Sequence, residues 1–123
     1  THTGSSAASD VYKRQIYRSY NFYPHTNNTI TNLNDLKRQL GKIRTNGYAL
    51  NHGEAFENSY GIGVAILDKD KRSFAGIALS GSKNILNPKT MMDYVDLLQS
   101  ASIKISRLIV ANWRLLLINN RFL

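Results

Sequence analysis

The sequence predicts an α+β fold, because a strand–turn–strand pattern lies between two segments of helical periodicity. Residues 60–81 read YGIGVAILDKDKRSFAGIALSG, where two apolar runs flank a charged turn. Before this hairpin, leucine and isoleucine recur at three- and four-residue spacing over 33–43. A second apolar stripe follows Pro88. The expected order is therefore helix, short strand, hairpin and helix.

The beginning of the chain carries weak signals. Residues 1–9 form a polar loop that leads into a possible helix through about Tyr20, with only a ragged apolar stripe. Residues 9–15, SDVYKRQ, resemble a translated adaptor sequence and are left out of fold reasoning. Residues 21–30 contain Pro24 and are interpreted as a turn. The first well-marked element therefore begins after residue 30.

The next segment has complete helix signals. Thr31 or Asn32 provides the N-cap and Gly47 provides the stop. The apolar stripe between them consists of Leu33, Leu36, Leu40 and Ile43. Residues 48–51 then form a short strand, and a polar loop over 52–59 leads to the hairpin.

The hairpin has one side with almost no side-chain bulk. If the two strands align, alternation places six small residues on this small-residue face: Gly61, Gly63, Ala65, Gly76, Ala78 and Ser80. Glycine within a strand weakens it and often marks the close approach of a backbone or a ligand. Two explanations fit, namely a helix packed tightly on this face or a small-molecule pocket with a few polar anchors. The residue pattern alone does not choose between them.

The last helix begins at Asn87 and Pro88, a favourable cap followed by proline. Its predicted buried stripe consists of Met91, Tyr94, Leu98, Ala101, Ile105 and Leu108. Beyond this stripe the pattern weakens. Residues 111–123 are therefore a tail that extends the helix, frays or covers an apolar patch.

The composition indicates one domain without disulfides or thiolate metal sites. The chain has 123 residues, of which 42% are hydrophobic and 20% charged, and it has no cysteine. A domain of this length buries about two thirds of its unfolded surface, which is enough for a core. The apolar runs fall far short of the ~20 residues that span a bilayer, and no signal peptide is visible. A cytoplasmic location without membrane contact is expected.

The net charge of +8 comes from 16 Lys and Arg against 8 Asp and Glu. Such an excess favours nucleic acid or acidic ligands when it is concentrated on one surface. Here the basic residues are scattered over 37–44, 69–72 and 104–107, without interleaved aromatic residues. They are interpreted as solvated faces, and direct DNA contact by this chain is not expected.

Metal and enzyme chemistry are not predicted. His2, His52 and Glu54 are residue types found in zinc sites, but none of their spacings is a metal motif, and loop polarity is the favoured interpretation. No nucleophile elbow, P-loop, dinucleotide fingerprint or paired-carboxylate pattern is present. We expect no metal, no cofactor and no enzymatic activity.

Residues 29–49, TITNLNDLKRQLGKIRTNGYA, combine T-I-T, a helix with L-x-x-x-L-x-x-I-R, and G-Y-A. In this spacing the chain resembles the effector-binding domain of IclR-type bacterial transcriptional regulators. The matching residues are Thr29, Ile30, Thr31, Leu36, Leu40, Ile43, Arg44, Gly47, Tyr48 and Ala49. The resemblance continues through Glu54, strand 61–67, Asp68 and Ser80-Gly81, and it covers about residues 20–110.

The resemblance implies a GAF-like fold, which is a curved, mainly antiparallel sheet flanked by helices, with the effector over one sheet face. Family members act as dimers or tetramers that bind small organic acids or aromatics and control catabolic operons. In them a separate upstream winged helix-turn-helix contacts DNA, and this chain resembles a single sensory domain truncated on its N-terminal side. The alternative is an oligomerisation module in which Leu36, Leu40 and Ile43 close the small-residue face and no ligand enters.

The resemblance also implies effector-binding positions, which are Ser80, Ala78, Gly61, Asn51, Ser5 and Ser6. Only Ser80 keeps the hydroxyl of the family pattern. Asn51 stands where an acid is frequent, Gly61 where a cysteine is frequent and Ala78 where a serine is frequent. A buried carboxylate needs several donors, and this set is thin. Because the face is also roomier, we expect a larger ligand with an apolar body, such as a sugar acid or aromatic acid, rather than one of glyoxylate size.

Overall fold

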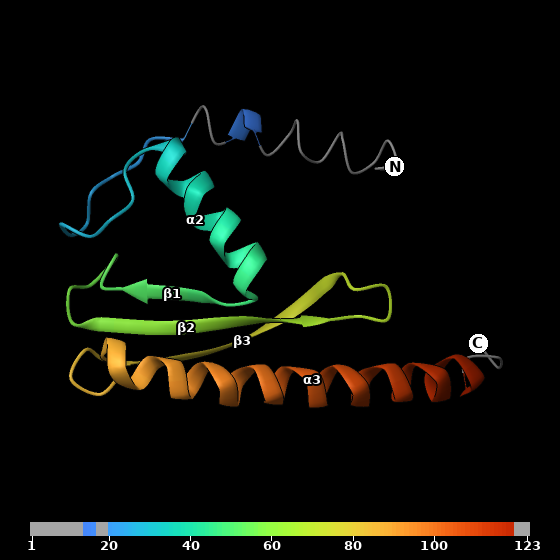
Figure 1. Ribbon diagram of the computed structural model, residues 1–123. Helices are drawn as coiled ribbons and strands as arrows, with labels where there is room; N and C mark the ends of the chain where they lie inside the picture. Colours follow the sequence, from blue (N-terminus) through green and yellow to red (C-terminus); the bar gives the residue numbers. More distant parts are fainter. Residues whose placement is uncertain (1–13, 17–19, 120–123) are drawn as a thin grey trace.

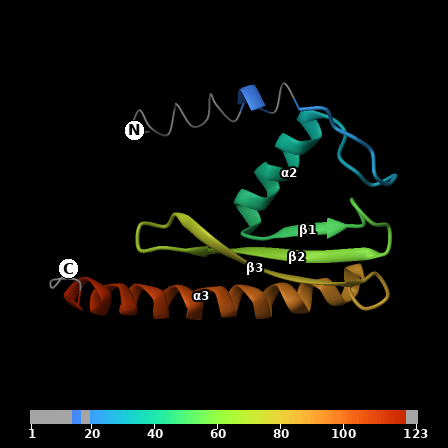
Figure 2. The same ribbon diagram turned by 180° about the vertical axis from the view of Figure 1, so that it is seen from behind.

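Three strands form one antiparallel sheet that lies between two helices (Figures 1 and 2). The computed structural model describes residues 14–16 and 20–119, with side chains as far as residue 112. Its main elements are α2 (Leu33–Asn46), β1 (Ala49–His52), β2 (Ser59–Leu67), β3 (Ser73–Ser82) and α3 (Pro88–Asn119). The strand order is β1-β2-β3, with α3 along one side of the sheet and α2 on the other. This arrangement confirms the predicted α+β fold and the order of its elements.

The ends of α2 follow the predicted capping residues. Asn32 is the N-cap, and its Oδ1 accepts a hydrogen bond from the Asp35 N–H at 2.8 Å. Gly47 closes the helix in the left-handed conformation, with φ of 80°, and its N–H donates to the Ile43 carbonyl at 2.8 Å. The local signals in the sequence therefore determine this helix.

Helical structure also occurs near both ends of the chain. Residues 14–16 are helical, whereas Tyr20, where the predicted helix was expected to end, is not. The other positions of that predicted helix lie outside the described residues. At the other end α3 runs to Asn119, so residues 111–119 of the predicted tail continue the helix.

The register confirms that the small residues of the two hairpin strands share a face. Gly61 pairs with Ser80, Gly63 with Ala78, and Ala65 with Gly76. Directly paired residues of an antiparallel sheet project to the same side, so all six lie together on the face away from α3. The small-residue face is therefore a real surface of the sheet.

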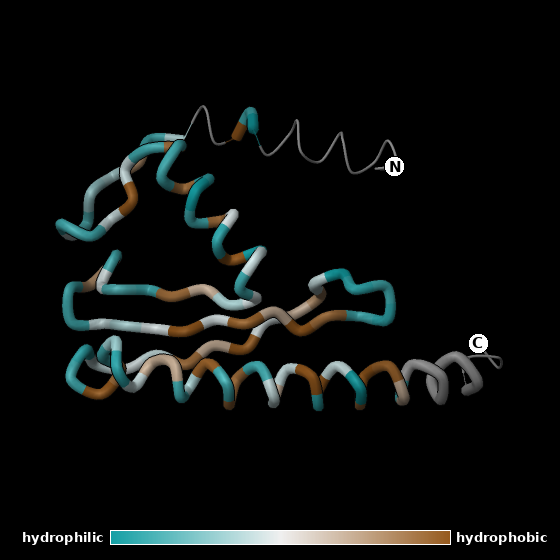
Figure 3. The backbone as a smooth tube through the Cα atoms, in the orientation of Figure 1, coloured by the Kyte–Doolittle hydropathy of each residue, from teal (hydrophilic) through white to brown (hydrophobic). Residues whose placement is uncertain are grey.

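The core lies between the other face of the sheet and α3. Ile62, Val64 and Ile66 of β2 are between 1% and 6% exposed, and Met91 and Val95 of α3 are each 1% exposed. Figure 3 shows the apolar stretches of β2 and α3 next to each other. The sheet thus buries only its branched aliphatic side against the long helix.

The buried stripe of α3 differs in part from the prediction. The predicted positions that are buried or partly buried are Met91, Tyr94, Leu98, Ala101 and Ile105. Leu108 is 64% exposed, so its assignment to the core is wrong, whereas Val95 and Ser102 are 1% and 8% exposed and were not predicted. At about 100° of rotation per residue, the line that runs through Val95 and Ser102 leaves Leu108 on the flank of the helix.

Two serines of α3 donate hydrogen bonds to the backbone of β2. Ser102 Oγ donates to the Ala65 carbonyl at 2.6 Å, and Ser106 Oγ donates to the Leu67 carbonyl at 2.5 Å. β1 pairs only with β2 residues 60–63, so these carbonyls lie beyond the part of β2 that β1 covers. The hydroxyls satisfy backbone acceptors that would otherwise need another partner.

Backbone hydrogen bonds close the β2–β3 turn. The Asp68 N–H donates to the Arg72 carbonyl at 2.8 Å, and the Lys71 N–H donates to the Asp68 carbonyl at 3.1 Å. Lys71 has φ of 62°, a left-handed conformation that is unfavourable for a residue with a side chain. The turn therefore holds a lysine at a position suited to glycine.

Replacing Lys71 by glycine is expected to raise the unfolding free energy by about 0.5–1 kcal/mol, because relief of the left-handed strain outweighs the entropy of the added glycine. Chemical denaturation of the two proteins measures this difference. Lys69→Gly is the matched control, since Lys69 lies in the same turn without a positive φ, and it should lower stability. A loss of stability in Lys71→Gly would contradict the assigned conformation.

The connection between β1 and β2 is held by the upstream loop. Thr26 Oγ1 donates to the Gly53 carbonyl at 2.7 Å, and Thr29 Oγ1 donates to the Glu54 carbonyl at 2.5 Å. Gly53 has φ of 73°, and an added Cβ would lie 2.6 Å from the Glu57 carbonyl oxygen. Both the conformation and the available space therefore require glycine at this position.

Gly53→Ala is expected to lower the unfolding free energy by about 2–3 kcal/mol, because the methyl group meets backbone and the left-handed conformation becomes strained. Urea denaturation followed by circular dichroism gives the value. Gly63→Ala provides the comparison, since a Cβ there would meet nothing within 4 Å. That variant should stay within about 0.5 kcal/mol of the parent. Equal losses in both would contradict the geometry of the loop.

Candidate functional site

The strand pairing brings four of the predicted site residues together. Gly61 of β2 pairs with Asn51 of β1 on one side and with Ser80 of β3 on the other. Ala78 lies two residues before Ser80 on the same face, opposite Gly63. Ser5 and Ser6, which were also predicted, fall on residues that the structure does not describe. The site is thus built from one end of the small-residue face.

The small-residue face is open over most of its length. Ala65, Gly76, Ala78 and Ser80 are all exposed. A Cβ at Gly63 would meet no atom within 4 Å, and one at Gly76 would come no closer than 3.6 Å to any neighbour. The face therefore leaves room next to its backbone that the described side chains do not fill.

Helix α2 does not seal this face. None of its residues is fully buried, and Leu40 is 38% exposed. Its contact with the sheet includes a hydrogen bond from Gln39 Nε2 to the Leu50 carbonyl at 3.4 Å. The described part of the chain therefore lacks the tight helix-on-sheet packing that the alternative explanation requires.

The polar groups of the site differ in their availability. Asn51 Oδ1 accepts from the Glu54 N–H at 3.0 Å, and its Nδ2 donates to the Ser59 carbonyl at 3.2 Å. Its amide is thus fixed in the β1–β2 connection with one N–H remaining. The Ser80 hydroxyl has no hydrogen-bond partner among the described residues. Ser80 is accordingly the side chain that is free to bind a ligand.

Gly61 controls the space between these two polar residues. A Cβ at this position would lie 3.4 Å from Ser80 Oγ, 3.3 Å from the Leu79 carbonyl oxygen and 3.8 Å from Asn51 Cβ. A larger side chain would crowd the Ser80 hydroxyl. Glycine keeps that hydroxyl accessible, which the alternation of the sequence could not show.

His52, one of the three residues considered as metal ligands, packs against an aromatic ring. The His52 ring meets the Tyr60 ring edge to face, with centroids 5.4 Å apart. Within the described ranges no group of three His, Cys, Asp or Glu side chains is placed to hold a metal ion, and His2 lies outside these ranges.

No helix in the described part of the chain is long and apolar enough to cross a bilayer.

The family match covers most of the chain. Residues 5–107 match the family described as bacterial transcriptional regulator IclR C-terminal. The chain belongs to this IclR family. The IclR C-terminal domain is a regulatory, non-enzymatic domain of transcription factors, which confirms the prediction that the chain is not an enzyme. No curated protein matches the chain in sequence.

Solved structures of IclR proteins share the fold. The IclR regulator of Thermotoga maritima is 32% identical, with a TM-score of 0.72 over 82% of this chain and 41% of that one. The C-terminal domain of the Escherichia coli transcriptional regulator KdgR is 26% identical, with a TM-score of 0.72 over 82% of this chain and 62% of that one. This chain therefore spans less than two thirds of either protein.

A third similar structure contains a ligand. It is a double mutant of the inducer-binding domain of the transcription factor PobR from Acinetobacter, in complex with 3-hydroxybenzoic acid. The identity is 21%, and the TM-score is 0.71 over 79% of this chain and 55% of that one. At this identity the similarity establishes the fold alone.

Proposed function

We propose that this chain is part of a single small-molecule-sensing domain of an IclR regulator and that it binds its effector on the small-residue face. The observation that carries the proposal is the open strand pair with a free Ser80 hydroxyl at one end. Exposed glycine and alanine backbone gives an apolar floor, and the hydroxyl gives a polar anchor, as small-molecule sites generally require.

The ligand that suits this face is an organic acid with an apolar body. Ser80 and the remaining Asn51 N–H provide few side-chain donors for a carboxylate, whereas the apolar floor of the face is wide. An aromatic or sugar acid would use both features. The complex of PobR with 3-hydroxybenzoic acid supports an aromatic acid as the first compound to test.

The proposed mechanism is allosteric. An effector that binds one arrangement of the domain better than another shifts the equilibrium between them. In a cytoplasmic dimer or tetramer, that shift would change how separate upstream winged helix-turn-helix domains sit on DNA. The chain itself would contact the effector and other subunits, and DNA would be contacted only through the upstream domain.

A thermal-shift screen of the chain with a panel of organic acids tests the proposal. The panel includes 3-hydroxybenzoate, benzoate, sugar acids and glyoxylate. An acid present at a hundredfold excess over its Kd should stabilise the fold by about 2.7 kcal/mol, which is a shift of about 10 °C for a domain of this size. Aromatic or sugar acids should shift the midpoint more than glyoxylate. No shift from any acid, on a folded sample, would favour an interaction module without a ligand.

A further inference from the structure

The outer edge of β3 has no strand beside it. β3 is the last strand in the order β1-β2-β3, so one side of its backbone pairs with β2 and the other side faces outward (Figures 1 and 2). The strand is ten residues long, and its sequence SFAGIALSGS contains neither a charged residue nor proline. Proteins usually protect an exposed edge with such residues or with a covering segment, because free N–H and C=O groups attract another strand. This edge is therefore a candidate interaction surface.

The hydrogen-bond pattern identifies which residues of β3 direct their backbone groups outward. The Lys83 N–H donates to the Asn58 carbonyl at 2.9 Å, so these two residues form a hydrogen-bonded pair at the end of the β2–β3 ladder. Hydrogen-bonded and non-hydrogen-bonded pairs alternate along an antiparallel ladder. The odd-numbered residues of β3 therefore bond to β2, and the N–H and C=O groups of Gly76, Ala78 and Ser80 point away from it.

The outer edge of β1 shows how the fold treats such groups elsewhere. The Leu50 carbonyl accepts a hydrogen bond from Gln39 Nε2 at 3.4 Å, and the His52 carbonyl accepts one from Asn28 Nδ2 at 3.0 Å. Side chains from α2 and from the upstream loop thus occupy the outward carbonyls of β1. This edge is also short, with four residues, and is less suited to pairing with another strand.

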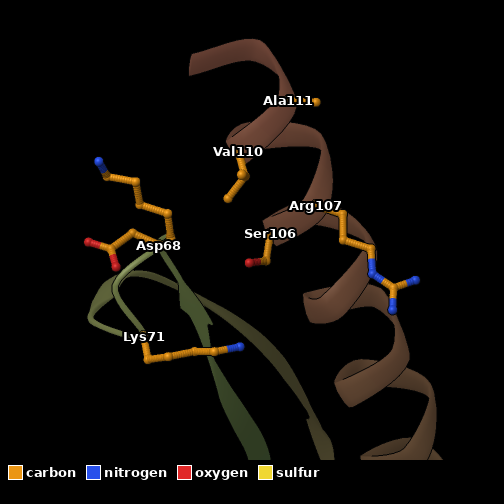
Figure 4. Close-up of a pocket in the computed structure, with 7 residues that line it drawn as sticks. Asp68, Lys71, Ser106, Arg107, Val110 and Ala111 are labelled. Atoms are coloured by element: carbon orange, nitrogen blue, oxygen red, sulfur yellow. The ribbon is translucent and has the colours of Figure 1, made fainter. Parts of the chain in front are cut away.

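The backbone of β2 beyond β1 is satisfied in the same way. The Ala65 carbonyl accepts from Ser102 Oγ and the Leu67 carbonyl accepts from Ser106 Oγ. Figure 4 shows the Ser106 side chain directed from α3 toward the hairpin. By contrast, no described side chain bonds to the outward backbone groups of residues 76, 78 and 80 on β3, and all three residues are exposed. Within the described part of the sheet, the open edge is on β3.

Helix α3 adds apolar surface next to this edge. Met92 marks the flank of α3 that faces β1, because its Sδ lies 3.8 Å from the Tyr48 hydroxyl oxygen. Leu97 and Leu108 lie about 140° and 160° around the helix from Met92, on the flank nearer to β3. They are 65% and 64% exposed. The backbone edge and this flank together offer both hydrogen bonds and apolar area, as stable protein interfaces do.

We propose that β3 pairs antiparallel with β3 of a second copy of this chain, which joins the two sheets and brings the two α3 helices to the same side. An uncharged strand edge is complementary to itself, since each copy offers the same alternating donors and acceptors. The pairing lies in the plane of the sheet and leaves the small-residue face open. The proposal rests on the proposed function only in that other subunits of the regulator supply the second copy.

The sequence of β3 favours a pair centred on Ala78. In this register Gly76 lies opposite Ser80 of the second copy, so outward-facing residues meet each other as hydrogen-bonded pairs. On the α3 side, Ile77 lies opposite Leu79 of the second copy, which gives an apolar cross-strand pair. The basic residues that flank the strand then lie opposite Ser73 and Asn84 rather than opposite each other.

Light scattering and amide hydrogen exchange of the full chain, from micromolar to millimolar concentration, test this pairing. Light scattering should show a dimer whose fraction rises with concentration. The amides of Gly76, Ala78 and Ser80 should become protected in step with that fraction. The amides of Ile77 and Leu79 bond to β2 and should be protected in monomer and dimer alike.

Three variants separate the strand edge from other surfaces. Ala78→Lys places like charges opposite each other at the centre of the pair and should raise the dimer Kd about fivefold. Ala78→Pro removes an outward N–H that β2 does not use, and it should raise the Kd about tenfold because two intersubunit hydrogen bonds are lost. Ala65→Lys adds the same charge to the same face on the central strand and should leave the Kd unchanged. Circular dichroism checks that each variant is folded.

Each contrary result has a distinct meaning. A chain that stays monomeric would overturn the proposal, and so would a dimer whose amides at residues 76, 78 and 80 exchange freely, because it would use another surface. Protection of these amides in a monomer would show that another segment of the chain covers the edge. An equal effect of Ala65→Lys would show general charge repulsion and overturn the assigned edge. No effector is used, so a negative result here would leave the effector proposal standing.

Discussion

Ala78→Leu is expected to abolish stabilisation by the best-binding organic acid while leaving the unfolding free energy within about 1 kcal/mol of the parent. Ala78 is exposed on the small-residue face and pairs with Gly63, where an added Cβ would meet no atom within 4 Å. Leucine would fill the space proposed for the effector without displacing core residues. Thermal shift with and without the acid, together with urea denaturation, gives both quantities.

The matched control for this substitution is Ala75→Leu. Ala75 is also exposed and lies on β3, but alternation places it on the face opposite to Ala78. It should retain the full response to the acid. If Ala78→Leu instead cost several kcal/mol, as overpacking of a filled core does, the face would be closed and the sensor proposal would be wrong.

Ile62→Ala is expected to lower the unfolding free energy by about 3–4 kcal/mol, the cost of a cavity in a tightly packed core. Ile62 is 1% exposed and packs with Leu86, Met91 and Val95 on the α3 side of the sheet. Its position in β2 is next to Gly61, which faces the other way. The loss should therefore appear as reduced stability, with the acid response of the remaining folded protein intact.

The comparison for this prediction is Ile77→Ala, measured by urea denaturation under the same conditions. Ile77 pairs with Val64 on the same face but is only partly buried. Its loss should be smaller, about 1–2 kcal/mol, because less surface leaves water when it folds. If Ile62→Ala cost less than Ile77→Ala, the core would not lie where the structure places it.

The sequence was sufficient for features that depend on neighbouring residues. Asn32 and Gly47 bound α2 because capping is local, and the charged turn from Asp68 to Arg72 separates two alternating strands. The two-residue alternation of side chains along a strand is enough to place Gly61 and Ser80 on one face of the sheet. These features follow from backbone geometry and need no tertiary information.

The features that the sequence did not provide depend on how separate elements meet. Leu108 fits the apolar periodicity of α3 but lies beside the line that contacts β2, while Ser102 is polar and lies within it. The choice between a packed helix and an open face depended on where α2 lies, which its own pattern does not determine. The fixed amide of Asn51 likewise depends on the conformation of the loop after β1.

An amide NMR titration of the chain with the panel acid that stabilises it most tests directly whether the small-residue face binds the effector. Saturable shifts are expected to centre on Gly61, Gly63, Ala78 and Ser80, all on the sheet face away from α3. Saturation confined to the β2–β3 turn and α3, or the absence of any saturable shift, would contradict the claim that the bare strand pair receives the effector.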